Sequence, residues 1–118
     1  MARIFSLRRK STLALRQRKE RLLQLLTLSP DAIRASFVTR YSVCGKRHCS
    51  CRHGGHKHGP FYYLTQCLAV GRMNKFLLKT PAQQQRAKNA VEHYRHFQEL
   101  LEELSQLNAQ LLRRDEPL

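Results

Sequence analysis

The stretch Cys44-Gly-Lys-Arg-His-Cys-Ser-Cys51, followed by His58-Gly-Pro-Phe-Tyr-Tyr-Leu64, decides how this chain folds. Three of the four cysteines lie in its first part, and with His58 they give the spacing Cys-x4-Cys-x-Cys-x6-His. Zinc takes four ligands in a tetrahedron, and three thiolates with one imidazole are a common structural set. The spacing therefore predicts a structural zinc site held by Cys44, Cys49, Cys51 and one histidine.

The composition of the surrounding loop, predicted over residues 44–60, favours metal binding. Glycine allows tight turns, and the loop holds Gly45, Gly54, Gly55 and Gly59. Positive charge favours thiolates, and the cations beside the ligands are Lys46, Arg47, Arg52 and Lys57. The residues themselves leave the fourth ligand open, because His48, His53 and His56 compete with His58.

Other uses of the cysteines remain open. A disulfide pair with a spare thiol needs an oxidising compartment, to which nothing else in the sequence points, and a redox-active Cys-x-x-Cys pair is absent from the sequence. We expect Cys67, inside a predicted strand, to be a buried small hydrophobe. A metal is favoured because a chain of 118 residues with two long helices has only a small β core, and metal ligation supplies folding energy.

A resemblance to a known family rests on the same residues. Cys44-Gly-Lys-x-x-Cys49-x-Cys51, then His58-Gly-Pro-Phe-Tyr-Tyr-Leu64, then a helix with Tyr94-Arg95, resembles a family of small basic bacterial proteins of unknown function. That family's hallmark is Cys-Gly-Lys-x-x-Cys-x-Cys…His-Gly-Pro-Tyr-Tyr, and the resemblance spans residues 35–110. It implies His58 as the fourth ligand. It also implies an association with mobile elements, because genes of the family often stand beside transposase or recombinase genes. It implies no catalytic role, and the hairpin departs from it because residues 70–76 are more apolar than in family members.

Outward from the loop, the pattern predicts an α+β protein. A small three-stranded antiparallel sheet with a metal-binding loop is flanked by an N-terminal amphipathic helix and a long C-terminal helix. β-Branched and aromatic residues predict a β region over residues 35–79, with strands at 35–43, 61–70 and 75–79 and a turn at Gly71-Arg-Met-Asn74. Ser11 or Thr12 caps a helix over residues 11–28. We expect residues 1–10 to be a basic arm that orders on a partner, and residues 11–118 to form a single domain.

The last helix is predicted over residues 81–113. Thr80 as N-cap, Pro81 at the first helical position and Gln83 form a capping-box arrangement. A heptad of a and d positions follows: Ala87, Ala90, Tyr94, Phe97, Leu101, Leu104, Asn108 and Leu111. Asn108 at an a position can set register and partner number. Two packings stay open: pairing with a second copy or a larger protein, and antiparallel packing on the helix over residues 11–28.

The charge is large and unevenly distributed. Lys plus Arg number 22 and Asp plus Glu number 8, a net charge of 22 − 8 = +14. Residues 1–80 hold 17 of the cations and only Glu20 and Asp31, whereas residues 81–118 are near neutral. Such a field concentrates polyanions, so we expect a nucleic acid as partner, DNA before RNA.

Neither a membrane span nor a signal peptide is visible. No apolar run approaches the ~18 residues of a membrane helix, and the chain opens without a signal-peptide pattern. We therefore expect no membrane partner and a cytoplasmic protein, associated with the nucleoid if it binds DNA.

The expected nucleic-acid contacts are the cations of the first helix, the loop and the hairpin, with one aromatic residue. They are Arg8, Arg9, Lys10, Arg16, Arg18, Arg21, Lys46, Arg47, Arg52, Lys57, Tyr62, Arg72 and Lys75. No Asp or Glu occurs from Ala32 to Val91, which speaks against carboxylate acid/base or two-metal catalysis there. We expect a zinc-stabilised, nucleic-acid-binding, non-enzymatic accessory or regulatory factor of a mobile element. The alternative is a protein–protein interaction module that uses the helix over residues 81–113.

Overall fold

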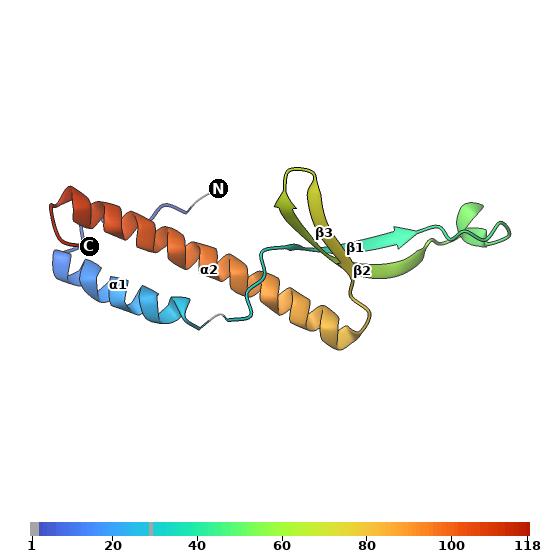
Figure 1. The fold of residues 1–118 in the computed structure, drawn as a ribbon, viewed down its shortest axis with the longest axis horizontal. Helices are drawn as coiled ribbons and strands as arrows, with labels where there is room; N and C mark the ends of the chain where they lie inside the picture. The colour runs from blue at the N-terminus through green and yellow to red at the C-terminus, as the bar shows by residue number, and fades with distance from the viewer. Residues whose placement is uncertain (1–2, 29) are drawn as a thin grey trace. The chain divides into compact units, whose positions relative to one another are not determined.

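The computed structural model describes residues 3–28 and 30–118 and confirms the predicted α+β class. Its elements, in chain order, are α1 (Thr12–Leu26), β1 (Ser36–Ser42), the 3₁₀ turn η1 (Ser50–Arg52), β2 (His58–Ala69), β3 (Arg72–Leu77) and α2 (Pro81–Arg113) (Figure 1). Met1 and Ala2 of the expected basic arm lie outside the described residues.

The chain divides into two compact units. Unit 1 comprises Met1–Ala32 and Glu92–Leu118, and unit 2 comprises Ile33–Val91. Helix α2 contributes its N-terminal part to unit 2 and the rest to unit 1. The prediction of one domain over residues 11–118 stays a prediction.

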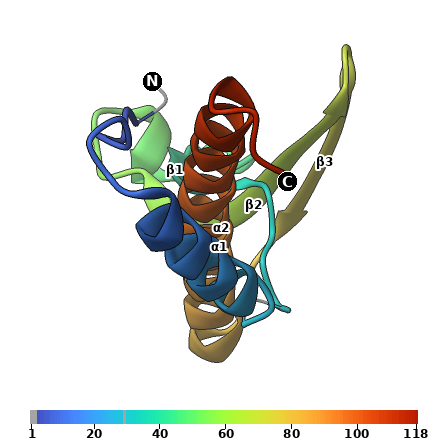
Figure 2. The ribbon, with the colours of Figure 1, turned by 90° about the vertical axis from the view of Figure 1, so that its left-hand side faces the viewer.

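In unit 1, α1 and the C-terminal part of α2 lie side by side and antiparallel (Figure 1 and Figure 2). Ser11 is the N-cap of α1, because its side chain accepts a hydrogen bond from the amide of Ala14 at 3.1 Å. The apolar stripe of α1 packs against one stripe of α2, and the buried leucines are Leu15, Leu22, Leu100, Leu107 and Leu111. Of the two packings left open by the sequence, the intramolecular one is therefore present.

Ion pairs join the two helices of unit 1. The carboxylate of Glu103 is nearly buried and binds the guanidinium of Arg18 through two hydrogen bonds, one of them 2.9 Å long. This hydrogen bonding raises the pKa of Arg18, and the charge of Glu103 adds to it. Arg16 pairs with Glu116 at 3.2 Å. Two of the cations expected to contact phosphate thus lie in ion pairs within unit 1.

The described part of the N-terminal arm packs on α2. Leu7 is buried in the leucine cluster and Phe5 packs beside it. The side chain of Gln106 accepts a hydrogen bond from the amide of Phe5 at 3.0 Å and donates one to the carbonyl of Arg3 at 2.7 Å. Residues of the described arm therefore have packing partners within unit 1, and the expectation that the arm orders on a partner stays a prediction.

Unit 2 is built on an antiparallel sheet with the strand order β1-β2-β3. Strand β2 begins at His58 rather than at Phe61, so the predicted loop is shorter than residues 44–60 and ends at the strand. Strand β3 begins at Arg72, so the turn lies before Arg72 rather than over residues 71–74. Gly71 in this turn has a φ of 75°, a conformation that favours glycine.

The first turns of α2 cover one face of the sheet. The hydroxyl of Thr80 accepts from the amide of Gln83 at 3.1 Å, which starts the helix where the sequence predicts it. Leu64 of β2 is buried with Leu78, Ala87 and Val91. Phe37 and Tyr62 pack against this cluster, which is the small hydrophobic core of unit 2.

Candidate metal centre

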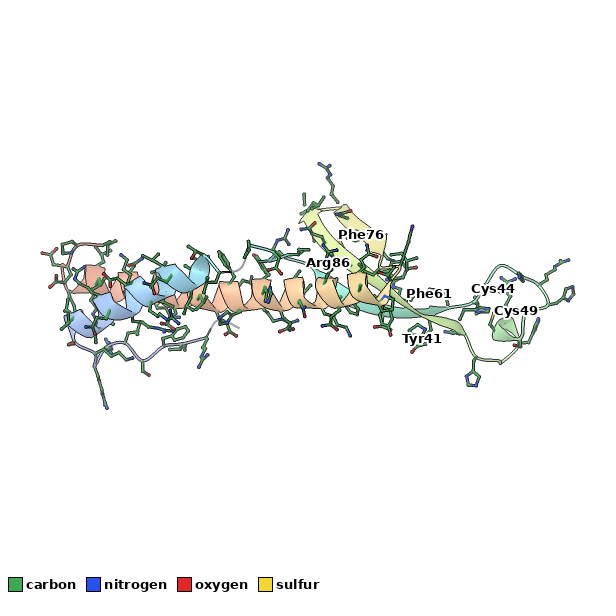
Figure 3. All side chains as sticks on the ribbon, turned by 90° about the horizontal axis from the view of Figure 1, so that it is seen from below. Tyr41, Cys44, Cys49, Phe61, Phe76 and Arg86 are labelled. Atoms are coloured by element: carbon green, nitrogen blue, oxygen red, sulfur yellow. The ribbon has the colours of Figure 1, made fainter. Side chains whose placement is uncertain are left out.

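Four side chains converge where the β1–β2 connection meets its strands. The ligand atoms of Cys44, Cys49, Cys51 and His58 all lie within 4.8 Å of one another. The sulfurs of Cys44 and Cys51 are 3.6 Å apart, and the sulfur of Cys49 is 3.2 Å from Nε2 of His58. Figure 3 shows Cys44 and Cys49 beyond the strands, at the end of unit 2 away from Phe76.

These separations fit a tetrahedral ion. With metal–sulfur bonds of ~2.3 Å, two sulfurs on a tetrahedron are ~3.8 Å apart. A disulfide requires ~2.05 Å between the sulfurs, and all four cysteines of the chain are free. The residues present therefore form a Cys3His site suited to a metal ion, and the disulfide alternative is not the arrangement observed.

Short-range hydrogen bonds shape the loop around the ligands. The amide of Cys49 donates to the carbonyl of Lys46, and the amide of Arg52 donates to the carbonyl of Cys49 in the first turn of η1. The amide of Cys44 lies 3.4 Å from the sulfur of Cys51 and donates to it. Cys51 is the most buried ligand, at 5% exposure, because η1 turns it inward.

His58 is the histidine that joins the three cysteines. It is the first residue of β2, so the strand holds it opposite Ser42, next to the loop that carries the cysteines. Of the rival ligands, His53 instead contacts the carbonyl of Arg47 at 3.1 Å, and His48 and His56 are exposed outside the cluster. The choice that the family resemblance implied is the one the structure brings together.

At Gly55 the loop has no room for a side chain. Its amide donates to the carbonyl of Ser50 at 2.7 Å, and a Cβ at this position would lie 2.5 Å from the same carbonyl oxygen. At Gly45, by contrast, a Cβ would meet nothing within 4 Å.

We predict that Gly55→Ala lowers the metal affinity of the protein by about 10- to 100-fold, because the backbone that orients Cys51 must shift. Gly45→Ala should leave that affinity within about twofold, since the backbone there is unstrained and the space is open. Competition with a chromogenic chelator measures both constants. Equal affinities for the two variants would contradict the role assigned to Gly55.

The sheet register separates the two neighbouring tyrosines of β2. Tyr62 packs against Phe37 beside the core of unit 2, with ring centroids 5.5 Å apart, and its expected contact with nucleic acid stays a prediction. Tyr63 points to the opposite face, where Nζ of Lys75 lies 4.6 Å from its ring centroid. Alternation along the strand predicts that the two tyrosines point apart, but not which of them enters the core.

The expected cations divide into two groups. Arg16 and Arg18 lie in the ion pairs of unit 1 described above. The others are exposed, namely Arg8, Arg9, Lys10, Arg21, Lys46, Arg47, Arg52, Lys57, Arg72 and Lys75.

The fourth cysteine, Cys67, is exposed, so the expectation that it is a buried small hydrophobe was wrong.

The helix seam is displaced from the predicted heptad. Leu104 and Leu111 take part in the packing on α1, but Leu100 and Leu107 are buried there and Leu101 is 49% exposed. Oδ1 of Asn108 is buried without a hydrogen-bond partner among the described residues. Of the remaining heptad positions, Ala87 and Ala90 are buried, whereas Tyr94 and Phe97 are partly exposed.

The fold and site define a small α+β protein with a candidate Cys3His metal centre. Residues 12–66 match a family model described as a domain of unknown function (DUF6788). The matched segment contains α1, β1 and all four candidate ligands. No curated protein and no solved structure matches the chain. Within the described residues, no helix has both the length and the apolar character needed to cross a bilayer.

Proposed function

We propose that this protein is a nucleic-acid-binding protein whose unit 2 is stabilised by one zinc ion on Cys44, Cys49, Cys51 and His58. Three thiolates and an imidazole favour zinc among the divalent ions, because soft sulfur ligands in a tetrahedron suit it. The ion supplies folding energy to a unit with a small hydrophobic core, and the unit presents cations to phosphate.

The observation that carries the proposal is the separation of charge between the units. Residues 33–91 hold eleven Lys and Arg and no Asp or Glu, a net charge of +11. The remaining residues hold the other 22 − 11 = 11 cations and all 8 acids. The four ion pairs among the described residues all lie in unit 1. The cations of unit 2 therefore have no carboxylate partner within that unit.

An uncompensated field of this kind attracts polyanions and speeds their binding. Phosphate contacts would come mainly from the exposed cations of the metal loop and the β2–β3 hairpin: Lys46, Arg47, Arg52, Lys57, Arg72 and Lys75. We expect DNA rather than RNA as the partner. A DNA-binding protein of this kind would be cytoplasmic and associated with the nucleoid. A non-enzymatic accessory or regulatory role beside a mobile element agrees with the family resemblance and with the lack of carboxylates in unit 2.

Native mass spectrometry of the metal-loaded protein tests the proposal directly. The protein is measured alone, with a 20-bp DNA duplex, with a 20-nucleotide DNA strand and with an RNA hairpin. We expect one zinc per chain and an adduct with nucleic acid at physiological ionic strength. A protein that carries the metal but forms no adduct with any of the three would overturn the nucleic-acid assignment.

A second function, as a protein–protein interaction module, is favoured by one surface of α2. The rings of Tyr94 and Phe97 stack with centroids 6.5 Å apart, and Leu101 is half-exposed beside them. An open pocket in unit 1 is lined by Tyr94, Leu101 and neighbouring polar side chains. A second copy or a larger protein would cover these side chains. Sedimentation at several concentrations reports the first case, since a strict monomer excludes self-association.

A further inference from the structure

The face of the sheet opposite to Leu64 has a composition of its own. The registers place Val38 and Leu77 beside Tyr63, so these three side chains point to the same side. Phe61, two residues before Tyr63, points to that side as well. We call this surface the open face, because the buried cluster of unit 2 contains Leu64 and α2 and so lies on the other side.

Each aromatic ring of the open face has a cation next to it. Arg40 is the cross-strand partner of Phe61. Lys75 is the partner of Thr65 and places Nζ 4.6 Å from the ring centroid of Tyr63. Both cations are exposed and both rings are only partly covered. With no acidic residue in the unit, the surface offers paired aromatic and cationic groups without an anion.

We infer that the open face binds single-stranded nucleic acid, with bases stacked on Phe61 and Tyr63 and phosphates held by Arg40 and Lys75. This inference rests on the proposed function and names the kind of nucleic acid that unit 2 takes. Aromatic rings next to cations are the two elements that sequence-tolerant single-strand binding requires, because every base has a π-face and every nucleotide a phosphate.

The rings distinguish a single strand from a duplex. In a duplex the faces of the bases are stacked on one another, so a ring on a sheet cannot reach them, whereas the bases of a single strand can be splayed out. Tyr63 is two positions after Phe61 on β2, which places the two residues ~6.7 Å apart along the strand. This is about twice the ~3.4 Å of helix axis that each nucleotide of one strand of B-DNA occupies. The two rings therefore fit bases that are drawn apart.

The contact of Lys75 with Tyr63 does not block this use of the ring. An exposed cation–π contact contributes about 2- to 5-fold to an equilibrium. A base stacked on an aromatic side chain contributes about 5- to 150-fold, and the displaced ammonium gains a phosphate. An acidic peptide would satisfy the cations but leave the rings without a stacking partner, so the aromatic pair favours nucleic acid.

The test compares ligands and variants in the metal-loaded full chain. Fluorescence anisotropy at physiological ionic strength measures binding of a 15-nucleotide oligothymidylate, a 15-nucleotide oligouridylate and a 15-bp DNA duplex. We expect the single strands to bind at least ~10-fold more tightly than the duplex, and the two single strands tell DNA from RNA. Polyglutamate of similar length is the acidic-peptide probe, and we expect it to bind more weakly than either strand.

Two variants locate the binding. Tyr63→Leu keeps an apolar side chain but removes the ring, and should weaken single-strand binding about 5- to 150-fold while duplex binding stays unchanged. Phe76→Leu is the matched control, because Phe76 is 43% exposed and pairs with Leu64 on the other face. Its affinity for the single strand should equal that of the wild type.

A second readout does not depend on affinity. An oligonucleotide that carries 5-iodouracil is crosslinked by light to the wild-type protein, and the crosslinked peptide is identified by mass spectrometry. We expect crosslinks at Phe61 or Tyr63. Metal content and thermal unfolding are measured for each variant, so loss of binding through misfolding is recognised. If Tyr63→Leu fails to fold, the position of the crosslink in the wild-type protein decides whether the open face binds the strand.

The failures of the two proposals are distinguishable. Binding of duplex and single strand with equal affinity, with crosslinks outside β1–β3 and no effect of Tyr63→Leu, would overturn the open-face inference and leave the proposed function intact. Absence of binding to every nucleic acid would overturn both. Polyglutamate binding as tight as oligothymidylate, and equally sensitive to Tyr63→Leu, would identify the face as a site for acidic proteins instead.

Discussion

Cys51→Ser is expected to abolish stoichiometric metal binding and to unfold unit 2, whereas Cys67→Ser is expected to change neither. Cys51 is the ligand with the lowest exposure, and its sulfur lies next to that of Cys44 and accepts from the Cys44 amide. Serine offers a hard oxygen in place of a thiolate, so the substituted site has three suitable ligands rather than four.

We expect a large effect because the proposed zinc ion would supply much of the stability of unit 2. Structural zinc sites bind with apparent free energies of about 10–16 kcal/mol near neutral pH. Whole small domains are stable by only about 5–15 kcal/mol. The buried core of unit 2 consists of Leu64, Leu78, Ala87 and Val91, which is small for a three-stranded sheet. The free energy lost with the proposed ion would therefore exceed the stability that this core can supply.

The two cysteine variants form a matched pair. Cys67 lies in the same sheet but is exposed and outside the cluster of ligands. Elemental analysis gives the metal content, and substitution by cobalt gives the absorption bands of a tetrahedral thiolate site. Hydrogen exchange read out by mass spectrometry then locates the unfolding. Amides of β1–β3 should lose protection in Cys51→Ser, whereas those of Leu107 and its neighbours in unit 1 should keep it. If the Cys51→Ser protein still binds one metal per chain and its strands stay protected, the metal centre assigned to Cys51 and its three neighbours is wrong.

Local signals explain the parts of the structure that the sequence predicted correctly. Helix α2 begins at Pro81 because the cap formed by Thr80 and Gln83 depends only on neighbouring residues. The three cysteine ligands fall within one short loop, so their spacing alone brings them together. The fourth ligand needed the register of β2, because four histidines lie close in sequence and only His58 is held by the strand.

The parts that were not predicted depend on contacts distant in sequence. Arg18 is the type of residue that binds phosphate, but in the structure it pairs with Glu103 on the other helix of unit 1. Leu100 is buried in place of Leu101 because the position of α1 selects the contacted stripe, and both residues are leucine. Cys67 is exposed because it lies three residues after Leu64 on β2, so that strand alternation places it on the face opposite to the core.

The affinity for DNA is expected to fall steeply with salt, and the slope should come from unit 2. A protein with six phosphate contacts on duplex DNA loses about 10³-fold in affinity between 50 and 200 mM salt, because each contact releases counterions. The double variant Lys46→Gln/Arg47→Gln removes two exposed cations of the metal loop. It should lower the slope of log affinity against log salt by about 1.8, since each phosphate contact contributes about 0.9.

The matched control removes two exposed cations from unit 1, in the variant Arg9→Gln/Arg21→Gln. Both double variants change the net charge equally, so a general effect of charge would give equal slopes. We expect the control to keep the slope of the wild type, because the cations of unit 1 share that unit with all 8 acidic residues of the chain. Anisotropy titrations of one labelled duplex at five salt concentrations give the three slopes. Equal reductions in the two variants would show that the field of the whole chain, rather than a surface of unit 2, holds the nucleic acid. A flat response in the wild type would mean that phosphate contacts do not drive binding, and the charge separation between the units would then need another ligand.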